Sequence, residues 1–309
     1  MASGYTVSGL TAYVEVNKDV LIKNLVLGLA KGDTIRNCRK QLGIKTKERL
    51  NYLDVDPVLQ DGSACGFSAS GSTVFSERDI ETAQIKAQDQ YCDKDLLGKF
   101  AEYMVKIAAN KEASDMPFEG EIINEVIEKC NEKMEKLVWQ GDKSGSDLID
   151  GFLTQAEGAD SASTIIVTAS TATTSVYDRV KAVIEAIPED ILDKAVVFIS
   201  PALYRKLGFE LVESFKYNAD LFNGKIEDRD VYFPGTEVRI HKTLGLKNSD
   251  KIYASAWENM VYGADLENDS EKVRFWYDDN SELFKYSIHW NSGVKTLFPD
   301  MVVVGKYAE

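Results

Sequence analysis

Residues 117–139 read PFEGEIINEVIEKCNEKMEKLVW, and this stretch decides how the rest of the chain is organised. Its apolar residues recur every three or four positions, which is the spacing of an amphipathic helix: Ile122, Ile123, Val126, Ile127, Cys130, Met134, Leu137 and Val138. Pro117 suits the first turn, because the N–H groups there have no intrahelical partner. Acidic residues between the apolar ones, such as Glu132 and Glu135, are expected on a solvated outer face. A helix of this length spans roughly 30 Å, enough for the spine of a thin domain.

The sequence changes character after this helix. Trp139-Gln140-Gly141-Asp142 predicts a turn, and a helical stripe over residues 176–187 is ended by Pro188. The run Ala195-Val196-Val197-Phe198-Ile199 has the continuous apolar character of a buried strand, and Ser200-Pro201 behind it can cap and begin a helix. Further strand-like segments follow to the end of the sequence. Among them, Val273-Phe275-Tyr277 and Phe284-Tyr286-Ile288 alternate on either side of Asp278-Asp279-Asn280, which predicts a hairpin. This part therefore predicts a second, α/β-like domain.

The segment before the helix is rich in small residues. Glycine and serine crowd residues 61–73, whereas residues 83–91 alternate between apolar and polar side chains, as a half-exposed strand does. Together these patterns predict a long hairpin with a tip that has too few apolar groups to order itself. Residues 1–13 show little periodicity and are expected to form an extended arm. The basic residues clustered over 34–53 are interpreted either as a solvated face or as a patch that meets an acidic neighbouring subunit.

The composition is that of a globular protein. The chain has 309 residues, of which 44% are hydrophobic and 28% charged, which leaves room for two domains. Its formal net charge of −14 repels nucleic acid and argues against sequence-specific DNA binding. No apolar run approaches the roughly 20 residues of a membrane span. The four cysteines form no CxxC pair and are expected as free thiols. We therefore expect a soluble intracellular protein with no membrane partner.

Residues that could carry chemistry are few. The two histidines, His241 and His289, lie in strand-like segments without a nucleophile–base–acid set, so both are expected to be structural. Asp142, Asp147 and Asp150 lack the glycine and the terminal glutamate of a calcium loop. By elimination the sequence predicts no catalytic residue, no cofactor, no cofactor-binding residue and no metal ligand.

A set of short motifs occurs in one order along nearly the whole chain: Thr6-Val7-Ser8-Gly9-Leu10, Tyr13-Val14-Glu15, Gln60-Asp61-Gly62-Ser63-Ala64-Cys65-Gly66, Phe75-Ser76-Glu77-Arg78, Trp139-Gln140-Gly141-Asp142, Ser200-Pro201-Ala202-Leu203, Phe233-Pro234-Gly235-Thr236 and Phe298-Pro299-Asp300. In this order they resemble the major capsid proteins of tailed bacteriophages, which share the Hong Kong 97 fold. The sequences of these motifs most resemble those in capsid proteins of phages that infect gut Bacteroidetes, including crAss-like phages.

The resemblance implies an α+β chain with the Hong Kong 97 phage capsid fold. Its expected parts are an N-terminal arm and short helix over residues 1–47, an extended loop in the form of a hairpin over 48–93, a peripheral domain over 94–150 and 266–300 that contains the spine helix 117–139, and an α/β-like axial domain over 151–265 and 301–309. The resemblance also implies contacts between subunits, for which we name residues of the hairpin tip and of the arm: Asp61, Gly62, Cys65, Gly66, Phe67, Gly71, Thr73, Tyr5, Leu10 and Tyr13.

The function that the resemblance implies is that of a structural shell subunit, not an enzyme. Hexamers and pentamers of the chain would enclose packaged double-stranded DNA without sequence-specific binding, in a virion capsid assembled in the host bacterial cytoplasm. Further expected partners are a portal and auxiliary or decoration proteins. Scaffolding, if needed, is expected as a separate protein, because no long coiled coil precedes the arm.

Two alternatives remain open from the sequence. An encapsulin-like nanocompartment would share the fold but enclose cargo enzymes. An α/β enzyme would hold a cofactor in the second domain, although Ser200-Pro201 stands where a glycine-rich phosphate loop would follow the strand.

Overall fold

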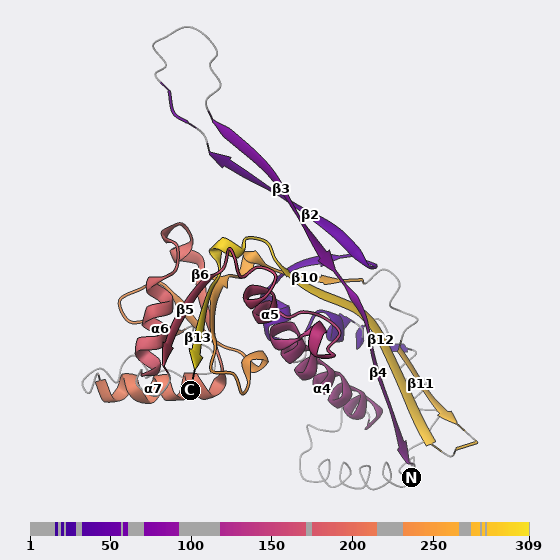
Figure 1. The fold of residues 1–309 in the computed structure, drawn as a ribbon. Helices are drawn as coiled ribbons and strands as arrows, with labels where there is room; N and C mark the ends of the chain where they lie inside the picture. The colour runs from indigo at the N-terminus through magenta and orange to yellow at the C-terminus, as the bar shows by residue number, and fades with distance from the viewer. Residues whose placement is uncertain are drawn as a thin grey trace.

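The computed structural model of the chain describes residues 16–17, 20–21, 23–28, 33–56, 58–60, 71–92, 118–170, 175–214, 231–265, 273–278, 280–281 and 283–308. Figure 1 shows two sheets, a long helix between them and a hairpin that projects from the body. One sheet has six strands, the other has five, and the hairpin has two. Helices and strands are therefore mixed, as the sequence predicts.

The helix predicted over residues 117–139 is α4 (Phe118–Gln140). Its apolar stripe lies in a core that also contains side chains of both sheets. The helix ends at Gln140, and the next residue must be glycine, because a Cβ atom on Gly141 would lie 2.5 Å from the carbonyl oxygens of Leu137 and Ile149. A short 3₁₀ turn, η2 (Lys143–Gly145), and the helix α5 (Phe152–Glu157) follow. The glycine thus lets the chain fold back tightly against the end of its longest helix.

The six-stranded sheet forms the α/β part of the molecule. Its strands lie in the order β5 (Ile165–Ser170), β13 (Val303–Ala308), β9 (Ile252–Ala256), β6 (Ala195–Ile199), β8 (Arg239–Lys242) and β7 (Val231–Tyr232). The helices α6 (Val176–Glu185) and α7 (Pro201–Ser214) pack against it. The predicted strand β6 is wholly buried because its alternate residues enter two cores: Val197 faces α6 and α7, whereas Phe198 faces the core of α4.

The five-stranded sheet is centred on the longest strand, β12 (Leu283–Thr296). Its other strands are β1 (Arg39–Leu42), β10 (Met260–Ala264), β11 (Val273–Asp278) and β4 (Ala83–Cys92). The strands β11 and β12 are the hairpin expected from their alternating pattern. We expected residues 260–264 in the axial domain, whereas β10 pairs with β12 in this sheet. The sequence does not show which of the two sheets residues 260–264 join. The strands β9 and β10 are both wholly buried, and the turn between them, η6 (Trp257–Asn259), is short.

The projecting hairpin consists of β2 (Lys47–Asp56) and β3 (Ser72–Glu81). It is shorter than the expected range of residues 48–93, because β4, the alternating strand that we took for its return, pairs with β12 over ten residues. The apolar residues of β4 supply the reason: Ile85 is buried in the core of α4. Only Thr82 separates β3 from β4, so one nearly continuous strand runs from the hairpin into the body.

Candidate assembly interface

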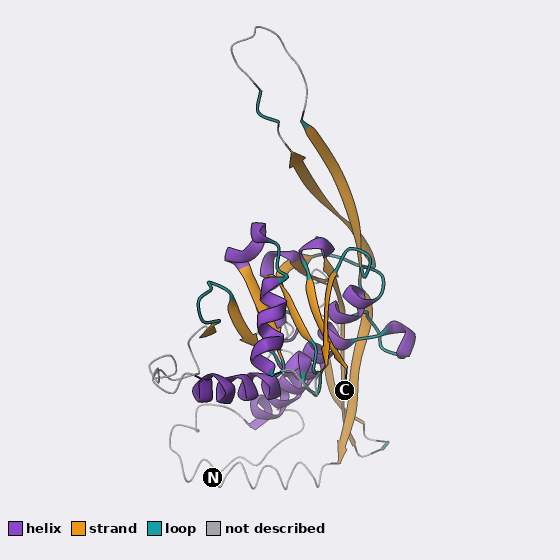
Figure 2. Ribbon diagram, turned by 60° about the vertical axis from the view of Figure 1, so that its left-hand side comes forward, coloured by secondary structure: helices purple, strands orange, loops and turns teal. Residues whose placement is uncertain are grey.

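The hairpin stands away from the body in both ribbon views (Figure 1 and Figure 2). Its strands pair over their whole length, from Lys47 opposite Glu81 to Asp56 opposite Ser72. At about 3.4 Å per residue, ten residues in each strand make a ribbon of roughly 34 Å. Such a ribbon carries its tip well beyond the core of its own subunit.

One face of the hairpin root packs on the body. Leu50 and Ile80 are buried in a small apolar cluster with side chains of β10 and of the segment that follows β12. Next to this cluster the Tyr52 ring meets the Phe298 ring edge-on, with 4.7 Å between the ring centroids. Both strands of the hairpin are therefore held at the root by apolar contacts.

Three charged side chains hold the same face. Arg78 of β3 donates hydrogen bonds to the Asp160 carboxylate and to the Leu297 carbonyl oxygen. Lys295 of β12 lies 3.7 Å from the second carboxylate oxygen of Asp160. None of the three charged side chains is more than 19% exposed. Burial and the nearby Arg78 charge lower the pKa of the Lys295 amine, and the Asp160 carboxylate opposes this shift. Breaking such a buried cluster is costly, so β3 is fixed to the body here.

Two glycines make room for the hairpin root. Gly263 of β10 lies directly opposite Gly293 of β12. A Cβ atom on Gly293 would lie 2.1 Å from the carbonyl oxygen of Glu81, and one on Gly263 would lie 2.9 Å from the side chains of Ile44 and Ile80. The paired glycines thus let the junction of β3 and β4 cross close above β10 and β12.

The opposite face of the hairpin root carries a ladder of ion pairs. The Lys47 amine lies 2.9 Å from the Asp79 carboxylate, and the Arg49 guanidinium lies 2.7 Å from the Glu77 carboxylate. These exposed pairs add little to stability, but they neutralise one another. Two members of the predicted basic cluster are therefore paired within their own chain rather than free for a neighbouring subunit.

The tip carries apolar side chains that the subunit itself does not cover. Val58 is 51% exposed and Leu59 is 94% exposed. Two residues predicted to contact another subunit lie nearby: Gly71 is exposed, and Thr73 lies in β3 opposite Val55. The other predicted contact residues lie outside the described part of the chain: Asp61, Gly62, Cys65, Gly66, Phe67, Tyr5, Leu10 and Tyr13.

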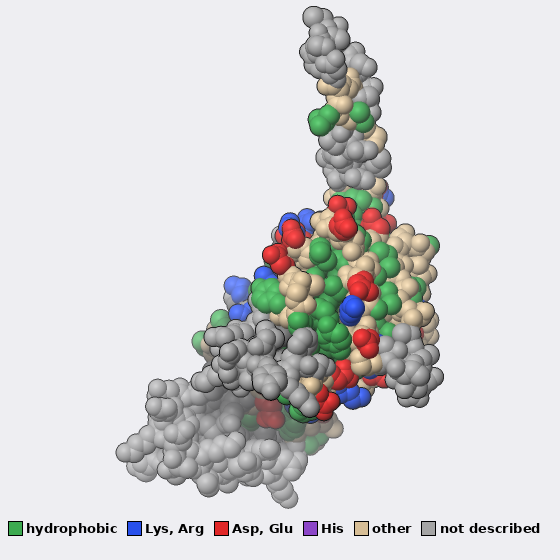
Figure 3. Space-filling model, turned by 90° about the vertical axis from the view of Figure 1, so that its left-hand side faces the viewer, with side chains coloured by type: hydrophobic (Ala, Val, Ile, Leu, Met, Phe, Trp, Pro, Cys, Tyr) green, Lys and Arg blue, Asp and Glu red, His purple; other side chains and the backbone are tan. Residues whose placement is uncertain are grey.

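A second exposed apolar surface lies on the side of the six-stranded sheet. Phe209 of α7 is 68% exposed, and Val212, one turn later on the same helix face, is also exposed. Figure 3 shows this side of the molecule, where apolar side chains reach the surface between acidic and basic ones. Adjacent exposed apolar side chains on one helix indicate a contact surface more strongly than a single one does.

The junction of the two sheets is filled with aromatic side chains. Trp139, at the end of α4, is completely buried, and its ring centroid lies 5.7 Å from that of Phe152, 5.0 Å from that of Phe198 and 5.2 Å from that of Tyr253. A Cβ atom on Gly245 would lie 1.9 Å from the Trp139 ring, so only glycine fits there. The predicted turn beginning at Trp139 thus lies where the parts of the chain meet.

A buried polar network lies beside this aromatic cluster. Glu135 of α4 is completely buried, and its Oε1 atom accepts hydrogen bonds from the Thr34 N–H group and the Thr243 hydroxyl, each at 3.0 Å. Thr34 lies in the short helix α2 (Asp33–Asn37), and its hydroxyl accepts a 2.7 Å hydrogen bond from the Trp139 indole N–H. The Glu135 Oε2 atom has no hydrogen-bond partner within the described residues. The network ties α2, α4 and the end of β8 together.

The burial of Glu135 differs from the position that the sequence predicts for it. We expected Glu132 and Glu135 on a solvated outer face, but only Glu132 is partly exposed. Burial raises the pKa of the Glu135 carboxyl, the hydrogen bonds from Thr34 and Thr243 oppose this, and the Asp33 charge adds to the rise. Sequence missed this residue because its neighbours on α4 are acidic and the donors lie roughly 100 residues away.

The histidines and thiols occupy ordinary positions. His241 Nε2 lies 2.8 Å from the Asp33 carboxylate, and the His289 side chain is exposed. Cys38 is a buried free thiol and Cys130 a partly buried one. Where the structure describes the chain, no group of three or more His, Cys, Asp or Glu side chains is arranged to hold a metal ion. None of the helices among these residues combines the length and hydropathy of a bilayer crossing.

Comparison with known proteins bears on the fold. No model of a protein family matches the sequence, and no curated protein matches it. Solved structures do match. A chain of the satellite phage P4 procapsid that includes size determination (Sid) protein has a TM-score of 0.59 at 10% identity, over 100% of this chain and 94% of that one. A chain from Gordonia phage Cozz has a TM-score of 0.57 at 12% identity, over 90% of this chain and 87% of that one.

A third similar structure is a chain of the capsid of an empty GTA particle, with a TM-score of 0.53 at 13% identity over 90% of each chain. The agreement extends along nearly the whole length of each chain. The expected fold class is therefore confirmed: the chain is α+β and has the Hong Kong 97 phage capsid fold.

Proposed function

We propose that this chain is the major capsid protein of a tailed bacteriophage and assembles with its own copies into the hexamers and pentamers of an icosahedral or prolate shell. The hairpin is the observation that carries the proposal: it is fully paired, fixed at its root, and exposes 94% of Leu59 at its outer part. Holding an apolar side chain away from the core forgoes the free energy of its burial. A neighbouring subunit that covers the tip would supply that burial.

The anchored root supports this role mechanically. Arg78, Asp160 and Lys295 fix β3 to the body, and Gly293 lets the strand cross β12 closely. The direction of the hairpin is therefore set before a neighbour is met, which reduces the ordering cost of association. In a shell of many copies the same hairpin contact is repeated between subunits, so the ordering cost is reduced at each of these contacts.

The proposed domains of the subunit are those of the Hong Kong 97 fold. In this proposal, residues 94–150 and 266–300 form the peripheral domain and residues 151–265 and 301–309 the axial domain, with β10 transferred to the peripheral part because it pairs with β12. The exposed Phe209 and Val212 of α7 would then meet neighbouring axial domains.

The other partners follow from charge and from the fold. A net charge of −14 supports enclosing double-stranded DNA without sequence-specific binding, because an anionic chain does not trap packaged DNA. A portal and separate scaffolding, auxiliary or decoration proteins complete the proposed virion capsid, which is assembled in the cytoplasm of a bacterial host. The proposed role is structural and not enzymatic, and it needs no cofactor. The sequence motifs also support a relation to phages of gut Bacteroidetes, including crAss-like phages.

The proposal is tested with purified protein and two matched variants. Leu59→Ser removes the exposed apolar group of the hairpin, whereas Leu42→Ser makes the same change at an exposed position of β1. Light scattering, native mass spectrometry and negative-stain microscopy should detect rings or shells of the wild type and of Leu42→Ser. Leu59→Ser should need a higher protein concentration to assemble.

A wild-type chain that stays monomeric across protein and salt concentration would contradict the proposal. Shells that enclose a specific protein cargo would instead favour the nanocompartment.

A further inference from the structure

Among the described residues, the hairpin root covers one face of the five-stranded sheet at its β10 end. We call the rest of that face the polar sheet face, and it consists of outward side chains of β4, β11 and β12: Gln84, Lys86, Gln88, Gln90, Arg274, Trp276, Asp278, Lys285, Ser287 and His289. The residues that alternate with them, such as Phe275 and Ile288, are buried in the core with α4. Because successive side chains of a strand point to opposite sides, the polar sheet face points away from that core.

The strand register places these side chains in rows. Trp276 lies opposite Lys285, and Lys285 lies opposite Gln90. In the next row Gln88 Nε2 donates a 2.8 Å hydrogen bond to the Ser287 hydroxyl. The Ser287 hydroxyl also lies 2.8 Å from His289 Nε2. These contacts tie the three side chains to one another, which reduces the ordering cost of binding a partner.

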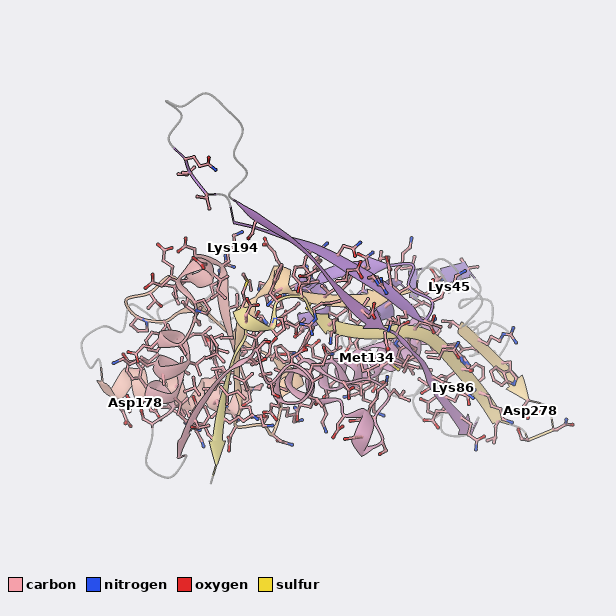
Figure 4. All side chains as sticks on the ribbon, turned by 45° about the horizontal axis from the view of Figure 1, so that its top comes forward. Lys45, Lys86, Met134, Asp178, Lys194 and Asp278 are labelled. Carbon is pink, nitrogen blue, oxygen red and sulfur yellow. The ribbon has the colours of Figure 1, made fainter. Side chains whose placement is uncertain are left out.

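The charge of this face is opposite in sign to that of the chain. Lys86, Arg274 and Lys285 are basic, and Asp278 is the acidic residue of this face within the described strands. Asp278 is already engaged, because its carboxylate lies 2.5 Å from the Lys285 amine, which helps lower the carboxyl pKa to about 2. Figure 4 labels Lys86 and Asp278 at the end of the molecule away from α6. The rest of a chain of net charge −14 therefore carries the compensating negative charge.

The face also exposes a large aromatic side chain. Trp276 is 40% exposed on β11, which pairs with β12 alone among the described strands and is therefore a sheet edge. Tryptophan and arginine are the residues most enriched at the energetic centres of protein–protein interfaces. Trp276 and Arg274 lie two residues apart on this same face.

A protein partner fits this surface better than nucleic acid does. Affinity for a nucleic-acid backbone grows with the number of phosphates neutralised, and the two basic side chains without a described ion pair neutralise few. The remaining negative charge of the chain would also repel a polyanion. A second copy, in contrast, brings the acidic surface that complements this face.

We infer that the polar sheet face is a docking surface for the acidic surface of a second copy of this chain, with Trp276 as its apolar anchor and Lys86 and Arg274 as its charged contacts. The inference rests on the proposed shell function and adds to it a contact other than the hairpin. Association through this face depends on charge and is weakened by salt.

The test uses two double variants with the same change in net charge. Lys86→Glu with Arg274→Glu reverses the charge of the polar sheet face, whereas Lys133→Glu with Lys136→Glu changes exposed residues of α4. Sedimentation and mass photometry measure self-association at low and at high salt, and circular dichroism verifies folding. We expect the first variant to weaken self-association about tenfold or more at low salt and to remove its salt dependence. Trp276→Ala should also weaken it, and Trp276→Phe should restore part of the loss.

The outcomes separate this inference from the proposed function. If the wild type assembles and both double variants assemble equally well, the polar sheet face is not a contact and the shell function stands. If the wild type does not associate, the proposed function and this inference both fail. Binding of a fluorescent DNA duplex that is lost only in Lys86→Glu with Arg274→Glu, while self-association is unchanged, would assign the face to nucleic acid and overturn the inference.

Discussion

The junction around Trp139 and the outer half of the hairpin differ in how far their apolar side chains are buried. At the junction, rings from α4, α5, β6 and β9 meet with no exposed surface, and Gly245 fits against the indole. In the hairpin, Leu59 is almost completely exposed, and the buried side chains that the structure describes there, Leu50 and Ile80, lie at the root. In the proposed function, folding and assembly therefore use separate residues. Substitutions should therefore divide into those that unfold the subunit and those that leave a folded subunit unable to assemble.

The largest expected effect on folding comes from the junction. Trp139→Ala should lower the free energy of unfolding by about 3–5 kcal/mol, because it removes a large buried ring and leaves the Thr34 hydroxyl without its indole partner. Urea denaturation measures the change. Trp276→Ala is the matched control: its ring is partly exposed, so its loss should cost much less. Equal losses in the two variants would contradict the contrast between buried and exposed regions.

The hairpin root should respond less strongly. In Gly293→Ala the new Cβ atom meets the Glu81 backbone, and we expect a loss of about 1–3 kcal/mol in thermal or urea unfolding. Gly208→Ala provides the control, because that glycine lies inside α7 with open space around it. It should raise stability by roughly 0.5–1 kcal/mol. If Gly293→Ala is as stable as the wild type, the hairpin root is not held as closely as the structure shows.

The polar network at the junction makes a smaller, pH-dependent contribution. Because the pKa of Glu135 is raised in the folded chain, its contribution is complete below the ordinary value of 4.5 and is lost as the pH rises from there through the raised pKa. Glu135→Gln should remove this part of the pH dependence, which amounts to at most about 1.4 kcal/mol per pH unit. Unfolding titrations between about pH 4 and 8 measure it. The exposed Glu185→Gln is the control, and identical pH profiles for wild type and Glu135→Gln would exclude the assignment.

Sequence reasoning recovered the elements whose patterns are local. The helix α4 begins and ends within one residue of its prediction, and β6, β11 and β12 were expected from apolar runs or alternation. Sequence reasoning failed where two strands that pair lie far apart in the chain. The strand β4 alternates as predicted, but it pairs with β12, roughly 200 residues later. Glu135 failed for the same reason, because its hydrogen-bond donors lie on other elements.

The candidate interface was predicted only in outline. A tip rich in glycine and serine indicates an element that needs a neighbour, and most of the residues named for contact lie outside the described part of the chain. The exposed Val58 and Leu59 stand just before the glycine-rich stretch, outside the residues predicted to contact another subunit. Two adjacent apolar residues in a polar loop were the signal that could have identified them.

The measurement that tests the account most directly shortens the hairpin. Replacing residues 57–71 by Asn-Gly keeps the strand register, because Asp56 and Ser72 lie opposite each other and a two-residue turn can join them. Thermal melting and electron microscopy are then recorded on the same protein. The account predicts a melting temperature within about 4 °C of the wild type, because no core is touched, together with the loss of closed shells. Normal shells built by the shortened chain, or a chain that no longer folds, would contradict it.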